Sequence, residues 1–332
     1  MTTTIALEPV DRVEITTLVD NQWDMLLQST ERAKRPPISP AGRPLVEAPY
    51  FLDPHLPEML TAEHGFSCLV AVTKGSRTRR TLFDAGLSVD GLAHNLHALQ
   101  ISLADIEGIV MSHGHFDHIG GLHGLVKHYG APNVPMLLHP DFWLRRRSKF
   151  PAGEFELPCP SRSALEGAGF HIVEQRQPSL LADRSVLITG EVDRTTEFEK
   201  GYAIHQAWRD GEWSPDPWIF DDQALIANVS GQGIVVLTGC GHSGIVNIVR
   251  YAQKLTGIDR VAAIVGGFHL GGPLFLPILP QTVEALAAVG PGIIVPGHCT
   301  GYDAVRAISL AMPKAFIVNS VGTRFVIEAT DA

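Results

Sequence analysis

Short apolar runs rich in β-branched residues alternate along the chain with stretches whose apolar residues recur every three or four positions. The short runs predict buried strands, and the longer spacing predicts helices packed on a sheet. The predicted strands are Val13–Val19, Ser67–Thr73, Thr81–Asp84, Ile109–Met111, Val134–Leu138, Val186–Thr189, Ala224–Val229, Gly233–Thr238, Val261–Val265 and Gly292–Val295. The predicted helices are Leu92–Leu99, Ile245–Leu255, Thr282–Val289 and Tyr302–Met312. This repeated succession predicts a layered α/β fold rather than a helical bundle or an all-β sandwich.

The segment at about 141–222 is the least regular part of the chain. It contains the run Arg145–Arg147, many prolines and the aromatic residues Trp208, Trp213, Trp218 and Phe220. We interpret it as an insertion or lid over a site, with an ordinary surface excursion as the alternative. The arginine run is interpreted as solvated surface rather than a phosphate clamp. No repeat or flexible linker is evident, so residues 1–332 are predicted to form one domain.

Composition narrows the class of protein and of partner. The chain has 332 residues, of which 45% are hydrophobic and 18% charged, as in ordinary globular proteins. The net charge of −9 argues against a nucleic-acid partner. No apolar run approaches the roughly 20 residues needed to span a bilayer. Four scattered cysteines and a start without a signal-peptide pattern predict a cytoplasmic location.

Three imidazoles and a carboxylate fall within six residues directly after a predicted strand. The order of residues is Met111-Ser-His113-Gly-His115-Phe-Asp117-His118-Ile-Gly-Gly. His113 and His115 are two positions apart, so in an extended turn both can face one ion. Asp117 and His118 follow as the chain enters a helix and can face a second ion. Such nitrogen and oxygen ligands suit zinc, and also iron or manganese. We therefore predict a centre with one or two divalent ions, zinc being preferred.

This HxHxDH segment, the earlier Thr81–Gly86 and the later strand-end histidines resemble the metallo-β-lactamase superfamily over most of the chain. The chain resembles one branch of this superfamily more closely. That branch includes the dihydropterin-6-methyl-(ribofuranosyl)aminobenzene 5′-phosphate synthases. The segments similar to that branch are Glu63–Ser67, Leu237–Asn247, Gly266–Leu270 and Pro296–Gly301. The resemblance implies a four-layer αβ/βα sandwich with metals at one edge, between the two sheets. It does not carry over the branch's activity, because one fold hosts many reactions.

The resemblance also implies metal ligands from the second half of the chain, and we choose His242 and His298. Each follows a strand-like run at a glycine-rich turn before a helix, where α/β sheets place their sites. Better-known members carry a bridging aspartate at the end of the strand before the first of these turns, whereas this chain has Cys240. That thiol is either a ligand or a buried, inert side chain. His139 and Glu191 are further ligand candidates, with structural roles as their alternatives.

Five residues receive further candidate roles. His269 is interpreted as a ligand, as a general acid that protonates a leaving group, or as a hydrogen-bonded support of the site. Asp84 is expected to orient a ligand histidine through its second ring nitrogen. Asp117 is expected to bind metal and to hold the proton of the nucleophile. Glu63 and His64 are interpreted as lining the cleft or, alternatively, as part of a plain helix-to-strand connection.

These features predict a metal-dependent hydrolase that uses a metal-activated water on a small anionic molecule carrying a phosphate, pyrophosphate or ester. One alternative is a dihydropterin-type synthase, a transferase that releases pyrophosphate. An iron enzyme handling oxygen or sulfur would use the same ligands, and a metal-binding sensor without catalysis is the alternative from another class. No nucleic-acid or membrane partner is expected, and the oligomeric state is left open, a homo-oligomer included.

Overall fold

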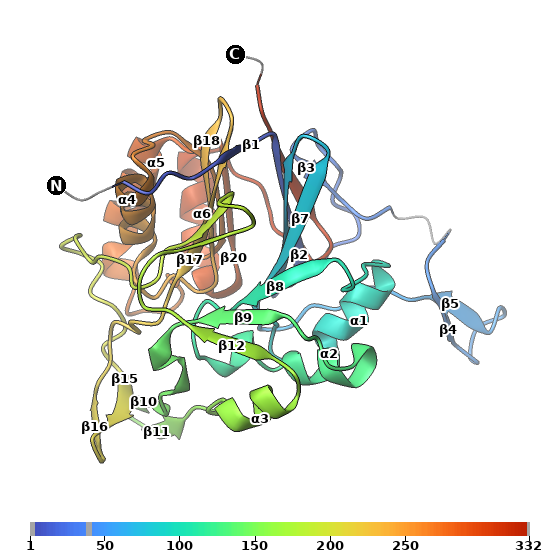
Figure 1. Cartoon of the computed structure of the whole chain (residues 1–332), viewed down its shortest axis with the longest axis horizontal. Helices are drawn as coiled ribbons and strands as arrows, with labels where there is room; N and C mark the ends of the chain where they lie inside the picture. Colours follow the sequence, from blue (N-terminus) through green and yellow to red (C-terminus); the bar gives the residue numbers. More distant parts are fainter. Residues whose placement is uncertain (1–3, 38–41, 331–332) are drawn as a thin grey trace.

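The computed structural model describes residues 4–37 and 42–330. Two large sheets form its centre (Figure 1). The eight-stranded sheet has the order β12 (His171–Glu174), β9 (Pro135–Leu138), β8 (Ile106–Val110), β7 (Arg77–Phe83), β6 (Ser67–Lys74), β2 (Arg12–Val19), β21 (Arg324–Glu328) and β3 (Ala33–Lys34). The seven-stranded sheet has the order β13 (Ser179–Leu181), β14 (Val186–Ile188), β17 (Ala224–Val229), β18 (Gly233–Thr238), β19 (Val261–Gly267) and β20 (Ile293–Gly297), with β1 (Pro9–Val10) paired to β17.

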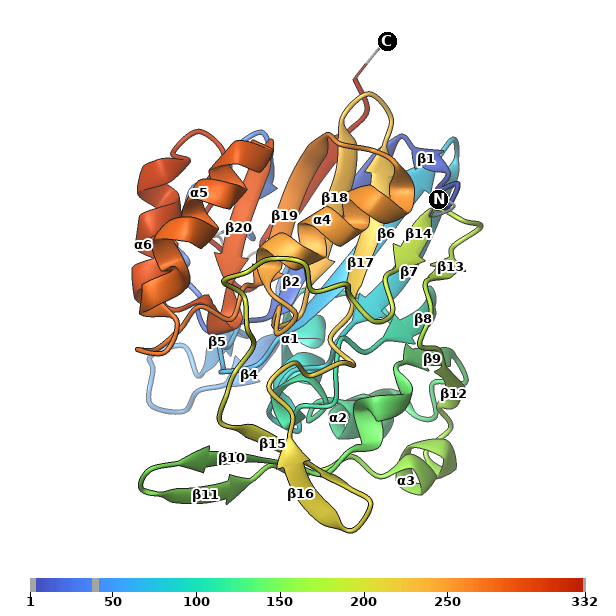
Figure 2. The same cartoon turned by 90° about the vertical axis from the view of Figure 1, so that its left-hand side faces the viewer.

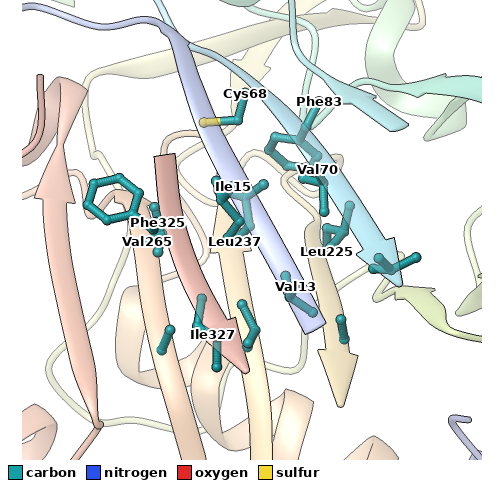
Figure 3. Packing of buried hydrophobic residues seen from close by; sticks show 14 of the residues in the cluster. Val13, Ile15, Cys68, Val70, Phe83, Leu225, Leu237, Val265, Phe325 and Ile327 are labelled. Atoms are coloured by element: carbon teal, nitrogen blue, oxygen red, sulfur yellow. The ribbon is translucent and has the colours of Figure 1, made fainter. Parts of the chain in front are cut away.

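The two sheets pack face to face through apolar side chains that alternate along their strands. Val13 and Ile15 of β2 and Val70 of β6 meet Leu237 of β18 and Val265 of β19 in one buried cluster (Figure 3). Because every second residue of a strand points to the same face, a period of two places all of these side chains between the sheets. This cluster is the inner core of a sandwich.

Helices cover the outer face of each sheet. On the seven-stranded sheet lie α4 (Ile245–Thr256), α5 (Leu279–Val289) and α6 (Tyr302–Ala311) (Figure 2). On the eight-stranded sheet lie α1 (Gly91–Ala98) and α2 (Leu122–Tyr129), whose Leu92 and Leu122 pack in a cluster with Leu82 of β7. The order helix, sheet, sheet, helix confirms the predicted four-layer αβ/βα sandwich.

The predicted elements match the observed ones to within a few residues, and β6 and β7 form a hairpin in which Lys74 pairs with Arg77. Among the elements not predicted are β21, α2 and the small hairpin of β4 (Leu45–Glu47) and β5 (His55–Pro57). No helix among residues 4–37 and 42–330 is long and apolar enough to cross a membrane.

The segment 141–222 does not form one separate body. A four-stranded sheet with the order β11 (Gly153–Glu156), β10 (Arg146–Phe150), β15 (His205–Arg209) and β16 (Glu212–Pro215) stands outside the two large sheets (Figure 2). Between its two hairpins, α3 (Arg162–Gly167) precedes β12, β13 and β14, which belong to the large sheets. We call the whole segment 141–222 the excursion.

The expectation of a solvated arginine run is wrong for its middle member. Arg145 is half exposed, but Arg146 is 2% exposed and lies between two buried carboxylates. Its Nε donates to Asp216 (3.1 Å) and its Nη2 to Asp221 (2.5 Å). A buried guanidinium persists only with such compensation, so position 146 belongs to the interior of the excursion and not to its surface.

Candidate metal centre

We call residues 111–121, which contain the HxHxDH segment, the motif loop. This loop follows β8, which ends at Val110, and it contains a short 3-10 turn, Phe116–His118, before α2 begins. At Gly114 the backbone passes so close to the next segment that a Cβ atom would lie 2.2 Å from the carbonyl oxygen of Phe142. The amide of Gly114 donates to Asp221 Oδ2 (2.7 Å). This position therefore requires glycine, and a buried carboxylate from the end of the excursion holds the loop in place.

The second half of the chain supplies side chains to the same edge. Cys240 and His242 follow β18, and His298 follows β20. These strands lie parallel on either side of β19, so their carboxyl ends meet at one edge of the seven-stranded sheet.

Three groups of side chains there have ligand atoms close enough to hold a metal ion, and two of the groups include residues of the HxHxDH segment. One of these two is His113, Cys240 and His242; the other is Asp117, His118, Cys240 and His298. Within each group the ligand atoms lie within 4.8 Å of one another. Cys240 belongs to both groups, so its sulfur lies between two candidate ion positions. This is the position at which the family resemblance implies a bridging aspartate. Its side chain is 3% exposed.

His115 and His269 border the first group. The ring of His115 lies 4.6 Å from that of His113 and 4.8 Å from that of His242, measured between centroids. The ring of His269 lies 4.0 Å from that of His242. We call His113, His115 and His242 the imidazole side of the centre, and Asp117, His118 and His298 the carboxylate side. Seven of the residues named as site candidates from the sequence thus lie together.

Hydrogen bonds to two buried carboxylates, Asp84 and Asp20, hold the histidines of the carboxylate side in position. Asp84 is fully buried, and its Oδ2 accepts from His118 Nδ1 (2.7 Å) and from Ser112 Oγ (2.7 Å). The predicted contact between Asp84 and a ligand histidine is therefore confirmed. On the other flank, Asp20 Oδ1 accepts from the amide of His298 (2.9 Å), and the amide side chain of Asn319 donates to Asp20 Oδ2.

Backbone strain concentrates at the centre. Asp84, His269 and His298 have φ values of 58°, 45° and 47°, in the left-handed region that non-glycine residues rarely adopt. Such conformations cost free energy and persist only where the surrounding structure enforces them, as at functional sites.

The two sides of the centre differ in charge. Burial, followed by the charges of neighbouring cationic groups, lowers the pKa of His113, His115 and His242 well below the ordinary value. On the other side, burial would raise the pKa of Asp117, but the charges of His118 and His298 and a hydrogen bond from His298 lower it. Burial would also lower the pKa of His298, whereas Cys299 and Asp117 raise it to about 9.

The buried nitrogens fit a bound cation. Within the described chain, Nε2 of His113, His115 and His118 and both ring nitrogens of His242 are buried without a hydrogen-bond partner. Buried polar atoms are almost always paired, so this number at one place calls for a partner outside the protein. Neutral imidazole nitrogens, a carboxylate and a thiol are ligands that a divalent ion such as zinc accepts.

The remaining ligand candidates lie elsewhere. His139 Nε2 is 3.7 Å from Glu191 Oε2, and neither residue belongs to any candidate ligand group among the described residues. His64 is exposed, and its ring stacks on that of His298 with 5.0 Å between centroids. Glu63 instead accepts from the amides of Leu87 (2.8 Å) and Ser88 (3.0 Å), so it supports the loop after β7.

The sequence analysis missed two residues of the excursion that face the centre. His205 in β15 is buried, and its ring lies 5.2 Å from that of His115 and 4.7 Å from that of Tyr202. Tyr202 in turn lies 5.4 Å from His269. Burial, followed by the charge of His269, lowers the pKa of His205 to about 3. No motif marks these residues, and their position follows only from the pairing of β15 with β10.

Comparisons with known proteins agree with this geometry. The model of the metallo-beta-lactamase superfamily matches residues 60–253. The 7,8-dihydropterin-6-methyl-4-(β-D-ribofuranosyl)-aminobenzene-5′-phosphate synthase of Methanocaldococcus jannaschii is 32% identical over 250 residues, covering 73% of this chain and 83% of that protein. An uncharacterized protein of the same organism is also 32% identical, over 263 residues, covering 79% of this chain and 92% of that protein.

Among solved structures, Tm1679, described as a metal-dependent hydrolase of the β-lactamase superfamily, has the same fold. It superposes with a TM-score of 0.68 at 23% sequence identity, over 96% of this chain and 100% of that one.

Proposed function

The chain belongs to the metallo-β-lactamase superfamily, and from this premise we propose that it is a metal-dependent hydrolase of a small anionic molecule. The reacting group in this proposal is a phosphate, pyrophosphate or ester. The observation that carries it is the pair of ligand groups that share Cys240 at one sheet edge. Two groups so close together favour an arrangement in which both ends of a single reacting bond are polarised.

Proteins of this fold bind divalent metal ions, and zinc is our choice for this chain. His113, His115, His242 and Cys240 would hold one ion, and Asp117, His118, His298 and Cys240 a second. A divalent ion there lowers the pKa of a bound water toward neutrality and offsets negative charge that develops on the reacting group.

The side chains around the ions then have separate tasks. Asp117 Oδ2 lies 3.3 Å from His298 Nε2 and 3.8 Å from His118 Nε2, so it is placed to accept a proton from the nucleophile at the carboxylate side. His269, beside His242, is placed to donate a proton to the leaving group. His205 and Tyr202 bound the same space from the excursion and keep bulk water from the imidazole side.

A second candidate is a synthase that joins an aromatic amine-type acceptor to a pterin diphosphate with loss of pyrophosphate. The identity to the methanogen synthase favours it. The aromatic lining of Tyr202, Phe275 and His269, with ring centroids 5.1–5.4 Å apart, suits a planar ring. Both reactions build negative charge on a leaving phosphate or pyrophosphate, so the same ions serve either.

The deciding experiment measures metal content and product release on tag-free protein. We expect stoichiometric divalent metal in the wild type, loss of metal in His115→Ala and His242→Ala, and release of phosphate or pyrophosphate from a panel of phosphoesters and pyrophosphates. Release that needs an added aromatic amine acceptor would identify the synthase, and release without it the hydrolase. A protein that retains metal but turns over no substrate of the panel would instead favour the sensor.

A further inference from the structure

We propose that Cys240, His269 and Cys299 form a third metal position in this molecule, one that takes a thiophilic divalent cation. Their two sulfur atoms and one ring nitrogen lie within 4.8 Å of one another. Cys299 is not among the residues expected from the sequence to bind metal. Two thiolates and an imidazole are a ligand set that binds zinc with a fourth position open. The inference goes beyond the proposed function, because neither Cys299 nor His269 is a ligand of the two proposed catalytic ions.

The position arises from the regular geometry of three neighbouring parallel strands. β18 ends at Thr238, β19 at Gly267 and β20 at Gly297. Cys240, His269 and Cys299 each lie two residues beyond the end of their strand. Since Thr238 pairs with Gly266 and Gly267 with Gly297, the three strands end within one residue of the same level, and equal offsets bring the three side chains together.

Hydrogen bonds tie the three loops to one another. The amide of Gly267 donates to the carbonyl of Gly239 (3.1 Å), and the amide of Gly271 donates to that of Cys299 (3.2 Å). The thiol of Cys299 donates to the carbonyl of Cys240 (3.2 Å). Because the backbones are joined directly, the distances between the three ligand atoms do not depend on long, flexible side chains. Such preorganisation favours binding.

Space for the sulfur atoms is reserved by a glycine. A Cβ at position 267 would lie 2.4 Å from the carbonyl oxygen of Gly239, 2.9 Å from Cys299 Sγ and 3.2 Å from Cys240 Cα. His269 is held at a φ of 45°, and its Nδ1 is buried without a partner in the part of the chain that the structure describes. An imidazole kept in a strained conformation beside two thiols, with one nitrogen unsatisfied, points to a ligand that completes it.

The position can be reached from outside. Cys299 and His269 are partly exposed, whereas Cys240 behind them is buried. The rings of Tyr202 and Phe275 lie 5.4 and 5.1 Å from that of His269, so they border the entrance. On binding, both thiols release their protons to solvent and each sulfur forms one bond to the cation. Because Cys240 belongs to all three groups, a cation at this position competes for its sulfur with the ions of the proposed catalytic pair.

The test is a cadmium titration of chelator-treated, tag-free protein under reducing conditions, followed by the ultraviolet sulfur-to-metal charge-transfer band. We expect Cys299→Ser and Cys240→Ser each to lower the band to about one half, because each removes one of two thiolate ligands. Cys159→Ser is the matched control, since this exposed thiol belongs to none of the three groups, and it should leave the band unchanged. A full band in Cys299→Ser would overturn the proposal.

Two further variants keep the outcome unambiguous. Gly267→Ala removes no thiol but puts a methyl group against the carbonyl oxygen of Gly239 and against Cys299 Sγ, so it should shift the two cysteine loops and lower the cadmium affinity and the limiting band. Full affinity in that variant would contradict the role given to this packing. His113→Ala damages the centre of the proposed function but none of these three ligands, so it should keep the two-thiolate band. Loss of activity with retention of the band thus separates the two proposals.

Discussion

The imidazole side and the carboxylate side of the centre stand at the same sheet edge, yet they are stabilised in different ways. Burial keeps the imidazole side neutral, with lowered histidine pKa values and unpartnered nitrogens. The carboxylate side balances its own charge, because Asp117 faces His298 and Asp84 holds His118. Ring nitrogens without a hydrogen-bond partner occur on both sides, at His118 and His298 as well as at the histidines of the imidazole side, so we infer that both sides depend on a bound cation. Only the carboxylate side contributes a negative charge of its own, that of Asp117.

The largest effect is expected from removing one ligand on each side. His242→Ala and His298→Ala should each lower metal affinity by more than the roughly 10- to 100-fold typical of outer-shell partners, because a direct bond is lost. Elemental analysis and competition with a chromophoric chelator measure this. If either variant keeps wild-type affinity, its side of the centre is not a metal site.

The next effect concerns Arg146, which donates to Asp221, the carboxylate that also accepts from the amide of Gly114 between His113 and His115. Arg146→Met leaves Asp221 buried without its cation and Asp216 paired only with Arg209, which should cost about 3 to 5 kcal/mol of unfolding free energy. Denaturant unfolding of the metal-free protein measures the loss. Arg145→Met is the matched control, because Arg145 is half exposed and its ion pair is worth less than about 1 kcal/mol. Equal losses in both variants would contradict the buried network.

A smaller effect is expected behind the carboxylate side. Asp84→Asn keeps the shape of the side chain but replaces a carboxylate oxygen that accepts from His118 and Ser112. Affinity for the ion on the carboxylate side should fall by about 10- to 100-fold, while the imidazole side keeps its ion. Stepwise metal titration resolves the two ions. Asp90→Asn, at an exposed ion pair, serves as the control. A loss on both sides would show that the two positions are not independent.

The smallest effect is a pH dependence of stability in the metal-free protein. The folded-state pKa of His205 is about 3 against an ordinary 6.5, so its contribution is complete above pH 6.5 and is lost as pH falls toward 3. The pKa of His298 is raised to about 9, so its contribution is complete below pH 6.5 and is lost as pH rises toward 9.

We therefore expect the thermal midpoint to fall on both sides of about pH 6.5, more steeply toward acid, because three other histidines have pKa values shifted in the same direction as that of His205. His205→Phe should flatten the acid arm and leave the alkaline arm unchanged. An acid arm that is no steeper than the alkaline one would contradict the difference between the two sides.

The sequence predicts most of the fold because both large sheets and their helices follow simple hydrophobic periods. The candidate ligands of the motif loop can also be predicted from the sequence, since they are neighbours in the chain. His205 and Cys299 escaped notice for a different reason: one reaches the centre through strand pairing in an irregular segment, and the other through the level at which three strands end. Arg146 looked like surface because its compensating carboxylates lie 70 and 75 positions away.

The hydrogen bond between the His298 amide and Asp20 joins residues 278 positions apart, and the one between Thr17 and Asn319 joins residues 302 apart. Closing such long loops is entropically costly and slow, so these contacts form late in folding. The motif loop, by contrast, is set up by contacts within the first sheet, such as that of Asp84 with His118. Within the carboxylate side, His298 is therefore expected to reach its place last, after Asp117 and His118 are already held by the loop that contains them.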